Sequence, residues 1–570
     1  MTLLDESILL LFKALYYFHY DLFWLGLLSG CFLLVMNADE DALKTKKFYA
    51  LLGIASLLPL AAYYSIIYLA GSLHLVVATS PRLLKWWVFC AAASLIFTVW
   101  WLRFGVRWSN AMKSKMTAKT SLERNKKTDV REIGKHIPER ALAFDPLKFT
   151  RHDKGVFLGL DKDKQPTYIA FGGATSAPHV QVIGTTGAGK GIALAVLASQ
   201  FLARGEAVFF CDPKNDEWAP SVMFAAAQRA GTPYHYIDLN RPNGAQFNLF
   251  EGATADEAFE LFQAGFSLTD KGDASDFYGI ADRREAGITA KLMADEGLTI
   301  AEAFEARQDA INDPRSGAEK FFGRLREMAE TPSLNAKSGG VCFADIIEDG
   351  GCVYIVGSMR NDIVKTAQRI LLVRLMQLAE RRDRMAGEWR KLCIVLDEIK
   401  YHLSRPALEG LGAARDKGVH LVIAHQSLGD LRDCTKDLNP DAVVDAVVEN
   451  CRIKICYQVQ SPDTAEWLAA MSGTIQVDDE MRTVRKNVVQ AETVDDGRKI
   501  RQADRYFIDV NMLLNLPPSV AVLYGAGLPK FVSIQLLKVA KSPEAVRINE
   551  GAGGAVKSTA DKLAELPALD

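Results

Sequence analysis

One stretch of the chain, HVQVIGTTGAGKG from His179 to Gly191, restricts the possible folds more than any other. Val180 to Ile183 is a short apolar run typical of a buried strand, and Ile192 to Leu202 has the pattern of a helix. Between them lies a glycine-rich loop that ends in Lys190. Glycines let backbone N–H groups turn toward bound phosphate oxygens, and the helix N-terminus adds a positive dipole. The stretch therefore predicts a strand, a phosphate-binding loop and a helix, in that order.

The spacing of this loop fits the pattern Gly-x4-Gly-Lys, in which the lysine reaches the β- and γ-phosphates of a nucleotide. The predicted nucleotide contacts are Gly184, Thr185, Thr186, Gly187, Ala188, Gly189, Lys190 and Gly191. Gly191 stands where most such loops have Ser or Thr, so the usual hydroxyl ligand of Mg²⁺ is missing. A glycine-rich turn that binds no ligand is the alternative, and we favour nucleotide binding.

Length and composition allow a large protein with several parts. The chain has 570 residues, which is enough for roughly three or four domains. Hydrophobic residues make up 49% of it, and the net charge of −2 hides an uneven distribution, because basic residues directly follow an apolar N-terminal segment. Nine cysteines are scattered without the spacing of a metal site, so we expect them to be reduced residues in the core of a cytosolic portion.

Two uncharged apolar runs, Phe48 to Ala70 and Trp86 to Leu102, are long enough to cross a bilayer. Tryptophans flank the second run, as is typical of a membrane interface. A third candidate, Leu22 to Met36, is apolar but short, and it predicts either a further span or an interfacial helix. No basic segment precedes it, so we expect no cleaved signal peptide.

Basic residues after the second run predict the orientation of these spans. Ten lysines and arginines lie between Arg103 and Lys135, so everything downstream is expected in the cytoplasm. With three spans the N-terminus lies outside, whereas Lys44, Lys46 and Lys47 lie inside. The basic run also suits lipid headgroups or nucleic acid, but we favour an ordinary stop-transfer flank.

The chain around the phosphate loop has the pattern of an α/β domain. Phe157 to Gly172, just before the loop, predicts a β-hairpin. Ala207 to Cys211 is an apolar strand that runs into Asp212-Pro213-Lys214, which is either a ligand-binding strand end or a turn. Between Asn248 and Asp345 the helical spacing of Ala, Leu and Phe predicts a small all-α subdomain, and the α/β pattern then resumes at Gly351.

A second anchor is Lys391 to Glu398, KLCIVLDE, in which an apolar run leads straight into two carboxylates. Central buried strands deliver carboxylates in this way to the Mg²⁺ of a nucleotide. In this interpretation Asp397 holds the metal, and Glu398 orients or deprotonates the attacking water. Two carboxylates at a strand end can instead begin a capped helix, but the phosphate loop earlier in the domain favours catalysis.

A further apolar strand, Val419 to Ala424, ends in His425-Gln426. We predict that Gln426 is a polar sensor at the same edge of the sheet. Arg415 lies just before that strand, and we predict that it lies on a face toward another subunit.

Five stretches together carry a specific resemblance. They are GTTGAGKG (Gly184 to Gly191), FFCDPKNDEW (Phe209 to Trp218), KLCIVLDE (Lys391 to Glu398), ARDKGVHLVIAHQSLGDL (Ala414 to Leu431) and CRIKICYQVQSPDTAEWL (Cys451 to Leu468). Through them the chain from about residue 150 to residue 540 resembles the VirD4/TraD/TraG type IV coupling proteins. The N-terminal membrane anchor fits that family in kind.

The resemblance implies a RecA-like P-loop ATPase of the bacterial inner membrane, with ATP and Mg²⁺ as cofactors and a homohexameric ring as its assembly. Such a protein receives relaxase-bound DNA, single- or double-stranded, and passes it to a type IV secretion channel during conjugation. By the same resemblance Lys190 binds phosphate, Asp397 binds the metal, Glu398 activates water and Gln426 is the sensor. Arg415 occupies the place of the arginine that completes the neighbouring subunit's site.

The chain departs from the family pattern at two places. The family commonly has Gly-Glu after the triplet Asp-Pro-Lys, whereas this chain has Asn215-Asp216. The family usually has two membrane spans, so a third span would also be a departure. Gly191 is a smaller departure, because members of the family often have Gly after the lysine of the phosphate loop. Two other functions stay open: an FtsK-like DNA pump, which the acidic, Gly- and Ala-rich tail from Ser542 to Asp570 argues against, and a receptor for protein substrates that uses ATP as an assembly switch.

We therefore expect an α/β, RecA-like nucleotide-binding domain that is interrupted by an all-α subdomain and preceded by transmembrane helices. The predicted parts are a transmembrane anchor of two or three helices (1–110), a basic cytoplasmic linker (111–150), the first part of the nucleotide-binding domain (151–247), the all-α subdomain (248–345), the second part of the nucleotide-binding domain (346–540) and a disordered tail (541–570).

Overall fold

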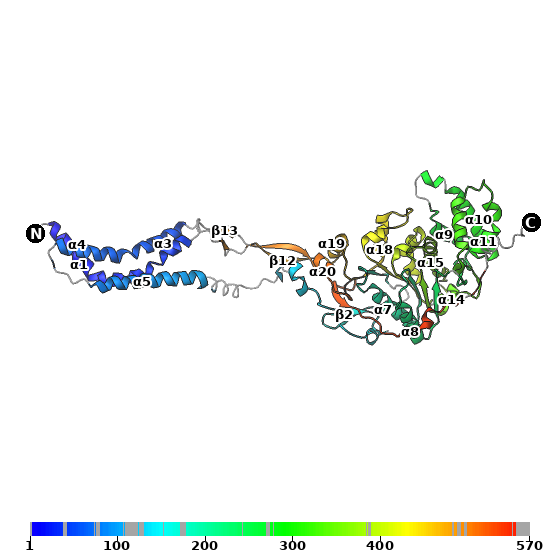
Figure 1. Cartoon of the computed structure of the whole chain (residues 1–570), viewed down its shortest axis with the longest axis horizontal. Helices are drawn as coiled ribbons and strands as arrows, with labels where there is room; N and C mark the ends of the chain where they lie inside the picture. Colours follow the sequence, from blue (N-terminus) through cyan, green and yellow to red (C-terminus); the bar gives the residue numbers. More distant parts are fainter. Residues whose placement is uncertain are drawn as a thin grey trace, which may run out of the picture. The chain divides into compact units, whose positions relative to one another are not determined.

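The computed structural model divides the chain into two compact units (Figure 1): residues 1–125 with 476–503, and residues 126–475 with 504–570. The structure describes residues 3–37, 43–72, 75, 80–105, 108, 123–124, 130–151, 153–170, 178–241, 243–269, 274–277, 279–383, 385, 389–481, 484–486, 492–494, 499–549 and 551–553. Residues 111–122 and 125–129 of the predicted basic linker lie outside these residues.

The first unit contains the apolar helices. They are α1 (Leu3–Leu22), η1 (Phe23–Leu28), α2 (Cys31–Asn37), α3 (Leu43–Ala55), α4 (Leu58–Ser72), α5 (Pro81–Trp100) and η2 (Trp101–Gly105). Two helical stretches, Lys44–Ser72 and Pro81–Gly105, are long and apolar enough to cross a membrane, and they contain the two predicted spans. The short third candidate, Leu22 to Met36, lies in a pair of helical segments, Glu6–Phe18 and Phe23–Met36. The two segments are bent by 68° relative to each other. Large apolar side chains such as Phe48, Ile96 and Phe97 are exposed on these helices, as expected for surfaces that face lipid.

Helix α5 is held to the second segment of this bent pair by polar contacts of small residues. The Gly30 N–H donates to Ser94 Oγ (3.0 Å), and Ser94 Oγ donates to the Leu27 carbonyl (2.5 Å). A Cβ on Gly30 would lie 2.1 Å from Thr98 Oγ1, so only glycine allows this close approach. The bent pair is therefore packed as part of the helical unit, whether or not it crosses a membrane.

The first unit also includes strands that the sequence did not predict. β12 (Thr474–Met481) lies between β1 (Glu123–Arg124) and β15 (Lys499–Tyr506) in a three-stranded sheet, with Glu123 opposite Val477 in parallel register. β13 (Val484–Lys486) and β14 (Glu492–Val494) form an antiparallel pair. Residues 476–503 therefore belong to the first unit, although the sequence predicted them as part of the nucleotide-binding domain.

An eleven-stranded sheet forms the centre of the second unit. Its order is β3 (Pro166–Ile169), β2 (Val156–Asp161), β17 (Lys530–Ser533), β16 (Val520–Tyr524), β11 (Ile453–Cys456), β4 (Val180–Ile183), β10 (Val419–His425), β9 (Leu392–Leu396), β5 (Ala207–Asp212), β8 (Gly351–Val356) and β6 (Tyr234–Asp238). The run from β11 to β6 is parallel, and the other strands pair antiparallel. The predicted β-hairpin and α/β sheet are confirmed.

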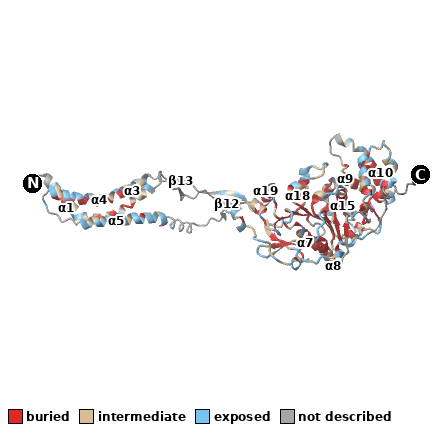
Figure 2. Cartoon of the chain, viewed as in Figure 1, coloured by how far each residue is buried: buried red, intermediate tan, exposed pale blue. Residues whose placement is uncertain are grey.

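Helices cover both faces of this sheet, which explains why its central strands are continuous apolar runs (Figure 2). Alternate residues of β5 point to opposite cores: Val208 and Phe210 pack with α7 (Lys190–Ala203) and α8 (Ala219–Ala230). Phe209 instead joins the core of the opposite face. The helices packed there include α15 (Asp362–Glu380), α16 (Arg405–Ala414) and α18 (Pro440–Asn450).

The predicted all-α range contains α9 (Ala255–Phe266), η5 (Ala274–Phe277), α10 (Ile280–Glu296), α11 (Ile300–Ala306), α12 (Gln308–Ile311), α13 (Glu319–Ala329) and η6 (Pro332–Leu334). It shares one core with the sheet, because Phe262 and Phe321 cluster with Ile370 of α15. Arg374, fully buried on α15, donates to the Glu251 carbonyl (2.6 Å) and pairs with Glu257 (3.4 Å). The insertion and α15 are therefore fastened by both apolar packing and a buried cation. The short strand β7 (Ala336–Ser338) and α14 (Phe343–Asp349) then lead into β8.

Part of the segment predicted to be a disordered tail is folded. It contains the turn η9 (Pro543–Val546), and Tyr234 donates its hydroxyl to the Ala545 carbonyl (2.9 Å). Ala545 is fully buried, and β18 (Ala552–Gly553) pairs with β7. The prediction of disorder is therefore wrong for residues 541–549 and 551–553, because apolar and backbone contacts anchor this part of the chain. Residues 554–570 lie outside the described residues.

The helical unit generates a prediction about topology. The segment before residue 22 contains Lys13 as its single basic residue, so little positive charge retains it in the cytoplasm. A reporter enzyme that is active only outside the cytoplasm, fused at the N-terminus, should therefore be active in cells. The same reporter fused after residue 135 should be silent. An inactive N-terminal fusion that is stably made would mean that the bent pair does not cross.

A candidate nucleotide-binding site

The loop between β4 and α7 has the conformation of a phosphate cradle. Gly187 and Gly189 have φ angles of +80° and +122°, which other residues adopt only with strain. A Cβ on Gly184 would lie 2.7 Å from the Cβ of Tyr457, a fully buried side chain beneath the loop. The loop is tied to β11 and the residues after it, since Thr185 N–H donates to the Gln458 carbonyl (2.8 Å). These constraints present the loop's backbone in one conformation.

Lys190 is the first residue of α7 and its ammonium lies inside the loop. Its Nζ donates to the carbonyls of Gly184 (2.5 Å) and Thr185 (3.4 Å). Burial lowers the pKa of Lys190, and the charge of Glu398 partly offsets this effect. The lysine is thus a largely desolvated cation at the position where the phosphate oxygens of a nucleotide would lie.

Gly191 occupies an exposed position in the first turn of α7, and a Cβ built there meets nothing within 4 Å. A hydroxyl-bearing residue would therefore fit. The missing side chain is a property of the sequence and not a requirement of the fold.

Asp397 and Glu398 follow β9 directly and lie at the carboxyl edge of the sheet. A third residue, Lys214, joins them: its Nζ lies 3.0 Å from Asp397 Oδ2 and 2.6 Å from Glu398 Oε1. Lys214 follows β5, which is the neighbour of β9 in parallel register. Sequence reasoning assigned no role to Lys214, although the triplet Asp-Pro-Lys at a strand end was a usable signal.

The electrostatics of the acid pair depends on this lysine. Burial raises the pKa of the Asp397 carboxyl, and Lys214 offsets only part of the increase. Burial also acts to raise the pKa of Glu398, but the hydrogen bond and the charge of Lys214 outweigh it, and the pKa lies below its usual value. Glu398 is therefore ionised at neutral pH, as a group that accepts a proton must be.

Each carboxylate has one oxygen available for a further ligand. Asp397 Oδ1 and Glu398 Oε2 are buried and have no hydrogen-bond partner within the described part of the chain. No cluster of three or more His, Cys, Asp or Glu is found among the described residues, so a metal ion here would need oxygens from outside the protein. This donor set fits Mg²⁺, which keeps several waters and is bound by one or two carboxylates together with substrate phosphates.

Gln426 lies at the carboxyl end of β10, next to β9. Its Nε2 donates to Glu398 Oε1 (3.0 Å), and its backbone N–H donates to Asp430 Oδ2 (2.9 Å). The structure thus brings the predicted sensor into direct contact with the predicted base. The preceding residue, His425, is fully buried, and burial lowers its pKa to about 4, so it is neutral.

The turn after β5 explains the departure at Asn215-Asp216. Asn215 has a φ of +58°, a conformation natural for glycine that asparagine tolerates better than most residues. Asp216 Oδ1 accepts the N–H groups of Trp218 (2.8 Å) and Ala219 (2.7 Å) at the start of α8. Asp212-Pro213-Lys214 is therefore a turn at the end of β5, and the same turn positions Lys214 beside the acid pair.

Arg415 is the one predicted site residue that lies away from the loop within the chain. It belongs to η8 (Arg415–Lys417), at the amino end of β10, whereas Gln426 follows the carboxyl end. β10 has seven residues, so it separates them by about 23 Å. Arg415 lines a cavity of about 390 Å³ together with Arg452. Lys454, on β11, is instead buried and donates to the carbonyls of Val448 (3.0 Å) and Cys451 (2.6 Å).

Residues 391–517 match the family described as the TraM recognition site of TraD and TraG. The chain is 29% identical over 334 residues to Mobilization protein A of Escherichia coli, a match that covers 58% of this chain and 60% of that protein. The chain thus matches less than two thirds of that relative's length.

Solved structures of the bacterial conjugative coupling protein TrwBΔN70 have a similar fold. The unbound monoclinic form superposes with a TM-score of 0.50 and 18% identity, covering 72% of this chain and 97% of that one. The trigonal form in complex with sulphate gives a TM-score of 0.50 and 17% identity, covering 72% and 98%. The family match, the sequence relative and the shared fold confirm the resemblance predicted from the sequence: this chain is similar to the TraD/TraG and VirD4 coupling proteins of conjugative transfer.

Proposed function

We propose that this chain is a multi-pass protein of the bacterial inner membrane whose cytoplasmic, RecA-like domain binds ATP with Mg²⁺ and hydrolyses it to move DNA. The observation that carries the proposal is the convergence at one sheet edge of a phosphate loop, a buried acid pair and a glutamine that contacts the acid pair. The apolar helices of the first unit support the membrane location.

The roles of the residues follow from their contacts. Lys190 and the loop N–H groups bind the β- and γ-phosphates. Asp397 Oδ1 would bind the metal, and Glu398 Oε2 would orient the attacking water and accept its proton. Gln426 holds the other oxygen of Glu398 and so keeps the base in place. Mg²⁺, when bound, supplies positive charge that stabilises the negative charge building on the transferred phosphoryl group.

Assembly into a homohexameric ring completes the site in this proposal. Arg415 is too far along β10 to reach the loop of its own chain, so it can act only across a subunit interface. An arginine supplied in trans stabilises the transition state of phosphoryl transfer and makes hydrolysis depend on assembly.

The substrate of transport is proposed from the family likeness. The matches to a family named for TraD and TraG and to a mobilization protein support a coupling protein that receives a relaxase with its DNA and delivers it to a type IV secretion channel. A receptor that uses ATP only as an assembly switch is the alternative. Turnover that depends on Glu398 distinguishes the two.

The first prediction from this mechanism concerns the acid pair. Glu398→Gln should retain ATP binding and lose turnover by on the order of 10² to 10⁴, because the positioned base is gone. Lys190→Ala should weaken both ATP binding and turnover. Phosphate release and the affinity for a fluorescent ATP analogue are the measurements, and Glu466→Gln, on an exposed carboxylate of α19 (Pro462–Met471), is the control. Near-normal turnover of Glu398→Gln would remove it from the mechanism.

A matched pair of glycine substitutions tests the cradle. Gly189→Ala forces a side chain into a φ of +122° with its Cβ 3.0 Å from Tyr457 Cε1, so ATP affinity and thermal stability should both fall. Gly191→Ala meets open space in a helix, so it should keep ATP affinity and raise the free energy of unfolding by about 0.5–1 kcal/mol. Calorimetric binding and thermal unfolding measure both. If the two variants behaved alike, the loop would not have this conformation.

The trans arginine is tested by mixing. Arg415→Ala and Lys190→Ala should each be nearly inactive alone, whereas mixed rings should regain part of the activity, because an intact loop then meets an intact arginine across some interfaces. The variants are assembled together on single-stranded DNA, and phosphate release is measured. Full activity of Arg415→Ala by itself, or no recovery in rings shown to be mixed, would leave Arg415 a surface residue.

A further inference from the structure

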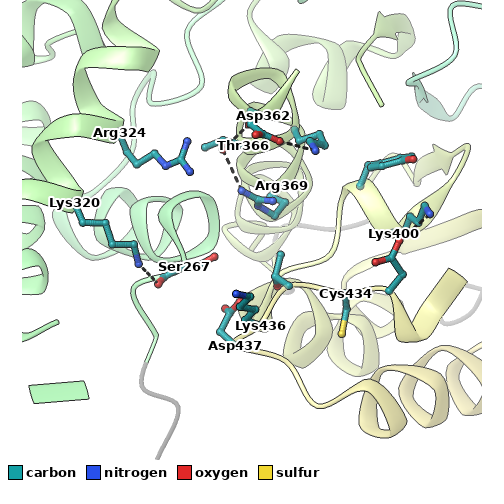
Figure 3. A pocket seen from close by; sticks show the side chains of 14 residues that line it. Ser267, Lys320, Arg324, Asp362, Thr366, Arg369, Lys400, Cys434, Lys436 and Asp437 are labelled. Atoms are coloured by element: carbon teal, nitrogen blue, oxygen red, sulfur yellow. Dashed lines mark hydrogen bonds and ion pairs between the residues drawn. The ribbon is translucent and has the colours of Figure 1, made fainter. Parts of the chain in front are cut away.

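A second pocket lies on the face of the domain where the helical insertion meets the sheet (Figure 3). It has a volume of about 490 Å³ and is lined from α9 and α13, from the amino end of α15, and from residues 400–401 and 433–437. Six cations line it: Lys320, Arg324, Lys365, Arg369, Lys400 and Lys436. Only three carboxylates do: Asp362, Asp433 and Asp437. We call this cavity the basic pocket.

The contacts within the basic pocket neutralise only part of its charge. Lys365 pairs with Asp362 (2.6 Å), Lys400 pairs with Asp433 (3.0 Å), and Arg324 pairs with Glu327 (2.7 Å), which lies outside the lining. Arg369 donates to a hydroxyl and a backbone carbonyl, those of Thr366 and Gly265, and not to a carboxylate. The pocket therefore combines a concave shape with an excess of positive charge, which raises the local concentration of anions.

Several polar atoms of this lining are left without partners. Arg369 Nε, Thr435 Oγ1 and Asp437 Oδ1 are buried and have no hydrogen-bond partner among the described residues, and the first two of them can donate to an anion. Burial of such atoms without a partner costs stability, and a polar ligand in the pocket that draws them into contact offsets this cost. This second observation points to a ligand independently of the charge.

The chemistry of the lining favours a phosphodiester over a protein segment. The remaining lining residues include four hydroxyls, on Ser267, Thr366, Thr435 and Tyr401, and the last of these also has an aromatic ring. None of the described residues that line the pocket is aliphatic, whereas protein interfaces take most of their binding energy from buried apolar anchors. Lysine, arginine and hydroxyl groups are the usual donors to nucleic-acid phosphates, and an aromatic ring stacks on a base.

The basic pocket is linked to the catalytic pair by a short series of contacts. Lys400 lies two residues after Glu398, and its Nζ lies 3.4 Å from Asp430 Oδ1. Asp430 Oδ2 accepts the backbone N–H of Gln426 (2.9 Å), and Gln426 donates to Glu398 (3.0 Å). An anion that draws Lys400 away from its carboxylates therefore removes a positive charge from beside Asp430. Because Asp430 accepts the N–H of Gln426, this loss also alters the position of Gln426 and of the base that it contacts.

We propose that the basic pocket binds the sugar-phosphate backbone of a DNA strand and that Lys400 couples this binding to Glu398 through Asp430 and Gln426. The proposal rests on the proposed function, because it assumes that DNA is the transported polymer. It adds the place at which DNA is sensed and the route by which its presence reaches the site of hydrolysis.

The binding half is tested on the full-length protein in detergent with a fluorescein-labelled thymidine 30-mer, by fluorescence anisotropy at several salt concentrations. Removing two phosphate contacts with Arg324→Ala/Lys436→Ala should weaken binding several-fold and reduce the slope of log K against log salt by about 1.4, since each contact to a single strand contributes about 0.7. Lys162→Ala, on an exposed lysine of the β2–β3 turn, should match the wild type. If the double variant does not fold, Lys436→Gln, at an exposed position, replaces it with half the change in slope.

The coupling half is tested by ATP turnover with and without the same oligonucleotide. Lys400→Gln should lose most of the stimulation by saturating DNA, whereas Arg324→Ala/Lys436→Ala should reach normal stimulation once enough DNA is added. Unaltered stimulation in Lys400→Gln would overturn the coupling.

Three results would overturn the pocket itself. One is DNA affinity and salt slope unchanged in Arg324→Ala/Lys436→Ala while the wild type binds DNA. The second is binding of poly-glutamate to the wild type but not to Arg324→Ala/Lys436→Ala, while DNA binds both proteins. This result would identify an acidic protein segment as the ligand. The third is inorganic phosphate that stabilises the wild type but not the variant against heat, again with DNA binding unaltered. A wild type that neither binds DNA nor is stimulated by it would contradict the proposed function as well, so the two failures are distinguishable.

Discussion

The candidate site depends on one constraint, the parallel pairing of four neighbouring strands. β4, β10, β9 and β5 are adjacent and run in the same direction, so their carboxyl ends lie along one edge of the sheet. Parallel sheets place ligands outside these ends. The phosphate loop, Gln426, the acid pair and Lys214 follow those four strands, and segments more than 180 residues apart in sequence thereby meet within hydrogen-bond distance.

Lys214 gives this edge its electrostatic character. Two carboxylates side by side and largely buried would repel each other and take up protons, and one shared ammonium reduces that tendency most for Glu398. Glu398 also has a φ of +55°, which is uncommon for a residue with a side chain. Strained conformations of this kind persist only where the surroundings fix them, and here the ion pair with Lys214 and the hydrogen bond from Gln426 do so.

The helical insertion contributes to the site through packing. Its phenylalanines share a core with α15 and the sheet, and the buried Arg374 ties both together. As a result the basic pocket is lined jointly by the insertion, the start of α15, residues 400–401 and residues 433–437. Lys400 in this lining lies two residues after Glu398 in the sequence, so the proposed coupling has a short route to the acid pair.

The sequence by itself determined the α/β class and the strands β4, β5, β9 and β10, because buried parallel strands are continuous apolar runs. From the same pattern it predicted Lys190, Asp397, Glu398 and Gln426 as site residues. It also identified the two long apolar helices, since length and composition suffice for that. Only the tertiary structure decided that Lys214 joins the acid pair, that β12, β13, β14 and β15 pair outside the eleven-stranded sheet and that residues 541–549 are folded. These features depend on strand order and on contacts between distant segments, which the local pattern of one sequence does not specify.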